Sequence, residues 1–211
     1  MKKALRKMAV RSASYLKCAI SWHSDDGQFA PSVWLLIAGA VYLLASFAHN
    51  IAEPTSVFAG ICLLAILILV CAIDARFGII PDNFVILVAV GGLIFAYCSG
   101  TAVWEERLVE SVLALTIFEA FRQSYRRFRG FNGLGFGDVK LLAAGTLWVG
   151  LSGIPSVLLV AVASALGGLL IRKAQGATFT GKQAIPFGPH LAAGLWYSWL
   201  VGSFQSGLWQ S

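Results

Sequence analysis

The chain alternates between long apolar runs and short polar breaks from residue 32 to residue 205. The runs approach the roughly 20 residues that cross a bilayer as a helix, and the shorter ones must borrow flanking residues. We expect six to seven membrane-spanning helices, of which 108–121 is the weakest because it contains Glu110 and Glu119. The expected apolar cores are 32–48, 56–73, 84–98, 108–121, 139–151, 156–171 and 190–205.

The composition supports a membrane setting for the whole chain. Hydrophobic residues make up 58% of the sequence and charged residues 12%, and the mean hydropathy is +0.76. This is too little polar surface to cover a soluble globule. The sequence therefore predicts an all-α integral membrane protein, with one polytopic bundle over 32–211. Residues 1–31 are expected to be a basic cytoplasmic segment, either an interfacial amphipathic helix or a tail that only orients the protein.

The positions of the cationic residues predict the orientation. With a cytoplasmic N-terminus and seven spans, all but two of the 16 Lys and Arg residues fall in cytoplasmic segments, the exceptions being Arg107 and Lys140. That asymmetry obeys the positive-inside rule and puts Asp74 and Asp138 on the cytoplasmic side. The net charge of +6 is then explained by topology and membrane lipid, so no nucleic-acid partner is expected.

The cysteines and histidines give no metal-ligand pattern. The four cysteines are single, without a C-x-x-C pair, and no histidine lies at ligand spacing from them. Buried small hydrophobic side chains are the favoured interpretation of the cysteines, and no metal site is predicted.

Four acidic residues lie in or at the ends of apolar runs, where an unpaired charge is costly. Glu110 and Glu119 are close enough to run ends to snorkel or to pair with Arg107 or Arg122. Asp74 and Asp138 are harder to explain in that way, which makes them candidates for function.

Asp74 ends an apolar run and precedes a helix stop. Gly78 permits a bend, and Pro81 prevents the helix from continuing. Its carboxylate is therefore expected at the end of a span.

Asp138 follows the segment NGLGFG, in which Gly133, Gly135 and Gly137 alternate with other residues. Such a segment can stay extended and let another backbone approach closely. Asp138 then opens a helix, where the positive end of the helix dipole favours a carboxylate.

Two facing carboxylates that share one proton can activate water against a peptide carbonyl, which suggests proteolysis beside a membrane. Two other classes stay open. Paired acids could relay protons or bind a cation in an ion- or proton-coupled transporter, although no inverted repeat of either segment is found. A structural assembly factor is a third possibility, and it would not need both acids.

Three segments, DARFGIIPD at 74–82, GLGFGDVKLLAA at 133–144 and IPFGPHLAAG at 185–194, together resemble the type IV prepilin peptidases, membrane aspartic proteases of the G-x-G-D class. The resemblance implies that Asp74 and Asp138 are the catalytic pair. It also implies residues that bind substrate or shape the site, namely Gly135, Gly137, Lys140, Ile80, Pro81, Asp82, Pro186, Phe187, Gly188 and Pro189.

The same resemblance implies the substrate and the location. The substrates would be prepilin or pseudopilin precursors with a short basic leader, cleaved at the cytoplasmic face of the bacterial inner membrane without metal or cofactor. Larger relatives carry a domain with two C-x-x-C pairs that is associated with N-methylation, and this sequence has no such pair. We therefore expect a short form with peptidase activity only. His190 stands where many relatives have an apolar residue, which could put a titratable group near the cleft. The oligomeric state stays open.

Overall fold

The structure is a computed structural model that describes residues 54–99, 101–130, 133–174 and 186–208. Its regular elements over these residues are the helices α3 (Pro54–Phe77), α4 (Asp82–Ser99), α5 (Thr101–Arg129), α6 (Phe136–Ala174) and α7 (Gly188–Leu208). The predictions for residues 1–31 and 32–48 lie outside the described residues.

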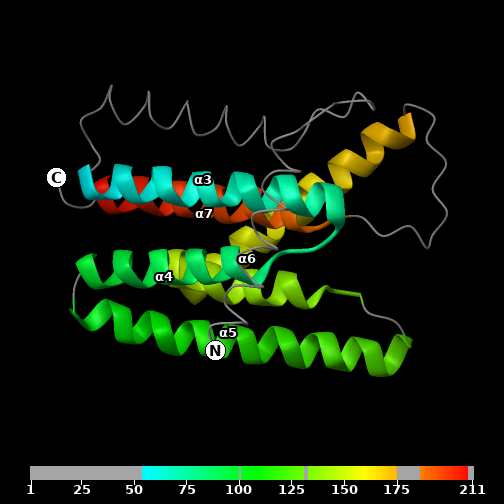
Figure 1. Cartoon of the computed structure of the whole chain (residues 1–211), viewed down its shortest axis with the longest axis horizontal. Helices are drawn as coiled ribbons and strands as arrows, with labels where there is room; N and C mark the ends of the chain where they lie inside the picture. Colours follow the sequence, from blue (N-terminus) through cyan, green and yellow to red (C-terminus); the bar gives the residue numbers. More distant parts are fainter. Residues whose placement is uncertain (1–53, 100, 131–132, 175–185, 209–211) are drawn as a thin grey trace, which may run out of the picture.

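The helices lie lengthwise beside one another in a bundle (Figure 1). Helix α3 packs on α7, α6 packs on both α7 and α5, and α4 lies against α3, α5 and α6. The C-terminal end of α3 and the first turns of α6 and α7 are at the same end of this bundle (Figure 1). That end is where the candidate site is found.

Within the residues that the structure describes, three helical segments are long and apolar enough to cross a membrane, Thr55–Phe77, Asp82–Ser99 and Phe136–Leu170. Large apolar side chains also cover the outside of the bundle, as Ile94, Leu159 and Leu170 do with exposed fractions of 59%, 70% and 67%. An apolar exterior of this extent suits a lipid surrounding and not water. The predicted all-α membrane fold is confirmed.

Helix α6 contains a sharp break at Gly150, which has a φ of 74° and a ψ of 169°. Only glycine adopts this backbone region readily. The two parts of α6 run away from the break in different directions (Figure 1), in agreement with the separate apolar cores expected at 139–151 and 156–171. The guanidinium of Arg107 occupies the space where a side chain at position 150 would lie. Arg107 donates to Glu110 at 2.9 Å, which confirms the predicted pairing of that acid.

Small residues let the helices approach closely. A Cβ on Gly92 of α4 would lie 2.8 Å from the Trp148 ring of α6, and a Cβ on Gly194 of α7 would collide with the carbonyl of Val157. The Trp148 indole N–H also donates to the carbonyl of Val88 at 2.7 Å, tying α6 to α4. Close approach and hydrogen bonds between helices are the interactions that hold membrane bundles together.

The prediction of buried cysteines is confirmed for Cys71, which is 1% exposed. It is wrong for Cys62 and Cys98, which are exposed. An apolar run that is uniform around the helix does not indicate which side faces the bundle, and for this reason their burial could not be predicted.

Candidate active site

Asp74 lies in the last turn of α3, directly before the end of that helix. The N–H of Gly78 donates to the Asp74 carbonyl at 2.8 Å, and Gly78 has a φ of 64°. A left-handed glycine with this bond is a common C-terminal cap, and it produces the bend that the sequence predicted at Gly78. The carbonyl of Pro81 then accepts from the N–H groups of Phe84 and Val85, which begins α4.

The Asp74 side chain is directed at the start of α7. Its exposed fraction is 4%, and its Oδ2 accepts from the N–H of Gly188 at 2.9 Å. Gly188 is the first residue of α7, and the carbonyl of Phe187 accepts the first bond of that helix from Leu191 at 3.0 Å. The N–H groups of a first helical turn have no partner within the helix and carry partial positive charge. The start of α7 therefore supplies a donor for a buried carboxylate.

The contact between Asp74 and Gly188 leaves no space for a side chain. A Cβ on Gly188 would lie 2.6 Å from Oδ2 of Asp74 and 2.8 Å from its Cγ. The thiol of Cys71 also lies 3.9 Å from the carbonyl of Pro189. These contacts give a physical reason for glycine in the segment at 185–189.

Asp138 lies in the first turn of α6. Gly135 precedes this helix, and its carbonyl accepts from the N–H of Val139 at 3.3 Å. The Asp138 Oδ2 in turn accepts from the N–H of Gly135 at 3.2 Å, so the side chain caps its own helix. The prediction that Asp138 opens a helix is confirmed. The predicted extended conformation is wrong for Gly137, which this cap brings into the first helical turn.

The two carboxyl groups are close enough for the charge of Asp74 to act on Asp138. They come from residues 64 positions apart in the chain and from different helices, and each accepts one backbone N–H. Asp74 is buried whereas Asp138 is partly exposed. Two carboxyl groups that repel one another in this way favour a state in which one is ionised and the other protonated.

Four further residues singled out in the sequence connect α4 to the start of α6. The ammonium of Lys140 lies 2.7 Å from Oδ1 of Asp82, and a Cβ on Gly137 would lie 3.1 Å from the Ile80 side chain. Together they hold the turn at 80–82 against the first turn of α6, beside Asp138.

His190 does not join the two carboxylates. Its Nδ1 lies 3.0 Å from the hydroxyl of Ser164, in the second part of α6. The Phe187 ring lies 6.4 Å from the imidazole, centroid to centroid. The side chain therefore connects α7 to α6, which gives no support to the alternative that it titrates within the site.

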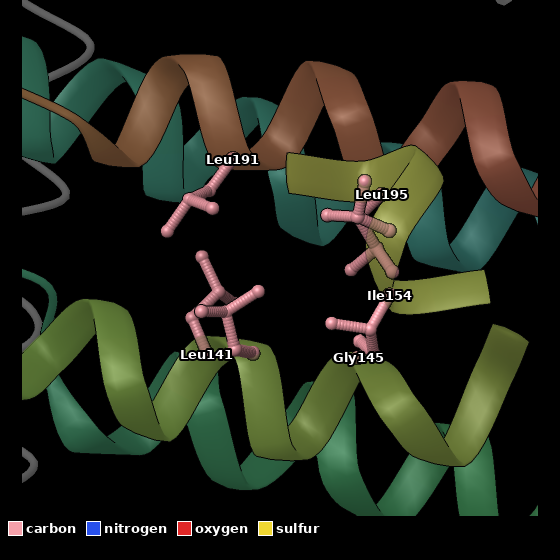
Figure 2. Close-up of a pocket in the computed structure, with 7 residues that line it drawn as sticks. Leu141, Gly145, Ile154, Leu191 and Leu195 are labelled. Carbon is pink, nitrogen blue, oxygen red and sulfur yellow. The ribbon is translucent and has the colours of Figure 1, made fainter. Parts of the chain in front are cut away.

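A small apolar cavity lies between the two parts of α6 and α7 (Figure 2). In Figure 2, Leu141 and Gly145 come from the first part of α6 and face Leu191 and Leu195 of α7, with Ile154 from the second part. The remaining lining residues are Leu142 and Val157. The cavity begins one helical turn beyond Asp138 and offers only apolar side chains.

Sequence reasoning missed the contact between Phe136 and Arg122. The guanidinium of Arg122 lies over the Phe136 ring, 5.1 Å from its centroid, and pairs with Glu119 at 2.7 Å. The pairing of Glu119 is the one predicted. A phenylalanine between two glycines, with Lys140 four residues later, was the only signal for the ring contact, because the approach of α5 cannot be read from local sequence.

These observations define the class of protein, an all-helical membrane protein whose polar site is a pair of interacting carboxylates at one end of its bundle. The chain belongs to the type IV leader peptidase family, whose sequence profile matches residues 61–171.

Similar proteins bear peptidase names. The chain is 33% identical over 140 residues to the prepilin leader peptidase/N-methyltransferase of Burkholderia pseudomallei (strain K96243), covering 64% of this chain and 43% of that protein. It is 31% identical over 120 residues to the leader peptidase HopD of Escherichia coli, covering 57% and 77%. With the prepilin leader peptidase/N-methyltransferase of Aeromonas hydrophila the identity is 28% over 176 residues, covering 82% and 58%. The chain thus spans about half the length of the two larger relatives. No solved structure matches it.

Proposed function

We propose that this protein is a membrane aspartic endopeptidase that removes the short basic leader from type IV prepilin or pseudopilin precursors. The observation that supports the proposal is that Asp74 and Asp138 lie at the same end of the bundle (Figure 1), at the end of α3 and the start of α6, each held by one backbone N–H. The family and the peptidase names of the relatives support the same activity.

The proposed reaction is hydrolysis of one peptide bond by the two carboxyl groups acting together. The ionised carboxylate takes a proton from a water molecule, whose oxygen attacks the scissile carbonyl carbon. The protonated partner donates its proton to the carbonyl oxygen, which gives a neutral tetrahedral diol. The carboxyl group that took the water proton then gives it to the amide nitrogen, while the other carboxylate takes a proton from one hydroxyl of the diol. The carbon–nitrogen bond breaks to give a carboxylic acid and an amine, and the pair again holds one proton. We describe the two groups as a coupled pair and assign neither step to a single residue.

The residues around the pair have supporting roles in this proposal. Gly135 is exposed and has no side chain, so a substrate backbone can approach Asp138 from that side. The pair of Lys140 and Asp82 shapes the site from α4, and Pro186 to Pro189 shape it from the start of α7.

We further propose six or seven spanning helices in the bacterial inner membrane, with the N-terminus and the carboxylate pair on the cytoplasmic side. The distribution of charge supports this orientation. Arg126, Arg127 and Arg129 lie in the last turn of α5, which ends where α6 begins. Arg107 lies in the first part of α5 against the break in α6, toward the opposite end.

The activity is tested with the purified chain in liposomes and a precursor pilin that has a basic leader, a glycine and an apolar helix. In an assay without added metal, mass spectrometry should find one product whose N-terminus follows the leader directly. Asp138→Asn serves as the matched inactive control, because the amide keeps the shape of the carboxyl. Failure of the folded native chain to cut any such precursor would overturn the proposal.

A further inference from the structure

Two cations lie against the Phe136 ring at the start of α6. The Lys140 ammonium is 4.5 Å from the ring centroid, and the Arg122 guanidinium is 5.1 Å from it. Lys140 stands one turn further along the same helix, whereas Arg122 belongs to α5. The ring itself is 45% exposed, so it is not held by burial in the core. The two cations are the contacts that fix it, since each is attracted to the electron-rich face of the ring.

Each cation is also anchored to an acid. Arg122 donates to both carboxylate oxygens of Glu119, at 2.8 and 2.7 Å. Lys140 donates to Asp82 at 2.7 Å. The bidentate guanidinium pair is the more rigid of the two, because both nitrogens are engaged. Phe136 is therefore the middle of a chain of contacts that joins α4, α6 and α5.

The ring matters for Asp138 because the segment around it has few other side chains. Gly135 and Gly137 flank Phe136, and Gly133 packs directly against the Tyr125 ring. Glycine has the greatest backbone freedom of any residue, so such a segment is loose unless something fixes it. The N–H of Gly135, next to Phe136, is the donor to the Asp138 carboxylate. Rotation about the Phe136 backbone would therefore displace that donor relative to the carboxylate and weaken the bond between them.

We infer that Phe136 and Arg122 are positioning residues, which fix the first turn of α6 so that Asp138 faces Asp74. The inference rests on the proposed peptidase activity, and it assigns α5 a part in the site through the contact of Arg122 with Phe136. A purely structural role would affect the amount of folded protein. A positioning role lowers kcat in the folded protein and leaves KM nearly unchanged, because substrate binding is retained.

The first experiment measures kcat and KM for cleavage by folded protein in liposomes. Phe136→Leu, which keeps an apolar side chain but removes the aromatic face, should lower kcat about fivefold to thirtyfold, the range that two cation–π contacts correspond to. Phe136→Trp keeps the aromatic face and should restore kcat to within about twofold of the native value. Phe128→Leu is the matched control, since that ring is 89% exposed near the same end of the bundle, and it should change nothing.

The link to α5 is tested with Arg122→Gln. The single variant should lower kcat. The double variant, Arg122→Gln with Phe136→Leu, should have a kcat within about twofold of the slower single variant, because both substitutions remove the same contact. Native kcat in Phe136→Leu, equal loss in Phe136→Trp, or multiplicative losses in the double variant would each overturn the inference.

A second readout does not depend on cleavage. Hydrogen exchange of a peptide covering 133–142 should be faster by at least about fivefold in Phe136→Leu than in native protein, and native-like in Phe136→Trp. Exchange in α7 should be the same in all three. If the native chain cuts no precursor but exchange changes as described, the peptidase proposal fails and the positioning contact stands. If cleavage occurs but exchange at 133–142 is unchanged, the positioning inference fails alone.

Discussion

Replacing Gly188 with alanine is expected to inactivate the site without unfolding the protein. The added Cβ would lie 2.6 Å from Oδ2, 2.8 Å from Cγ and 3.0 Å from Cβ of Asp74. All three atoms belong to a short buried side chain, so no flexible end can swing away. Restoring an ordinary contact of about 3.4 Å requires a shift of about 0.8 Å between Asp74 and the start of α7. The bond from the Gly188 N–H, now 2.9 Å, would be distorted with it.

A displacement of that size is large for a catalytic group. Misplacement by about 1 Å costs about a hundredfold in rate. We therefore expect kcat/KM for precursor cleavage to fall about a hundredfold in Gly188→Ala. Alanine is also compatible with a helix, and because Gly188 is the first residue of α7 the change leaves the interior of that helix intact. Stability and activity should therefore not decline in parallel.

The matched control is Gly167→Ala, also a glycine to alanine change within a helix. A Cβ on Gly167 would meet nothing within 4 Å, so activity should stay within about twofold of the native value. The assay is cleavage of a precursor pilin in liposomes, with the thermal midpoint of each variant measured in detergent. Native activity in Gly188→Ala would refute the reasoning, because it would mean that the position of Asp74 against α7 is not needed.

Two other substitutions test neighbouring parts of the structure. Glu119→Gln should keep at least about half of the cleavage rate, because a partly exposed ion pair contributes little and Arg122 still contacts the Phe136 ring; a loss above tenfold in well-folded protein would show that Glu119 has a larger role. Gly150→Ala should lower the free energy of unfolding by about 1–3 kcal/mol, because the φ of 74° and ψ of 169° suit glycine alone. Denaturant unfolding in detergent measures this, with Gly202→Ala as control, and equal stability of the two variants would contradict the strain argument.

Much of the fold could be predicted because local signals mark the helix ends. Gly78 and Pro81 indicated the end of α3 and the turn before α4, and the structure has a left-handed cap and a helix start at those residues. The break within α6 also lies close to where the apolar pattern was interrupted. Rotation of the helices could not be predicted, because uniformly apolar runs carry no sidedness, and Cys62 and Cys98 are exposed for that reason.

Candidate site residues could be singled out from the sequence where their own chemistry is unusual, whereas contacts between residues that are distant in the chain could not. Asp74 and Asp138 stood out because carboxylates are costly at membrane depth. The contact of Gly188 with Asp74 spans 114 positions, and that of Arg122 with Phe136 depends on how α5 approaches α6. No local sequence pattern predicts a contact between residues so far apart in the chain. The predicted conformation of Gly137 was wrong because the Asp138 carboxylate, three residues after Gly135, caps the helix. This cap outweighs the tendency of alternating glycines to stay extended.

The joint action of the two carboxylates is tested most directly by comparing Asp74→Asn, Asp138→Asn and the double variant in one cleavage assay. Each amide keeps the volume of the carboxyl but cannot share its proton, so each single variant should lose at least about a thousandfold in kcat. The double variant should be no slower than either single one, because groups that act as a unit are lost together. Folding is checked by the thermal midpoint of each variant. Substantial cleavage by either folded single variant would contradict the proposed mechanism.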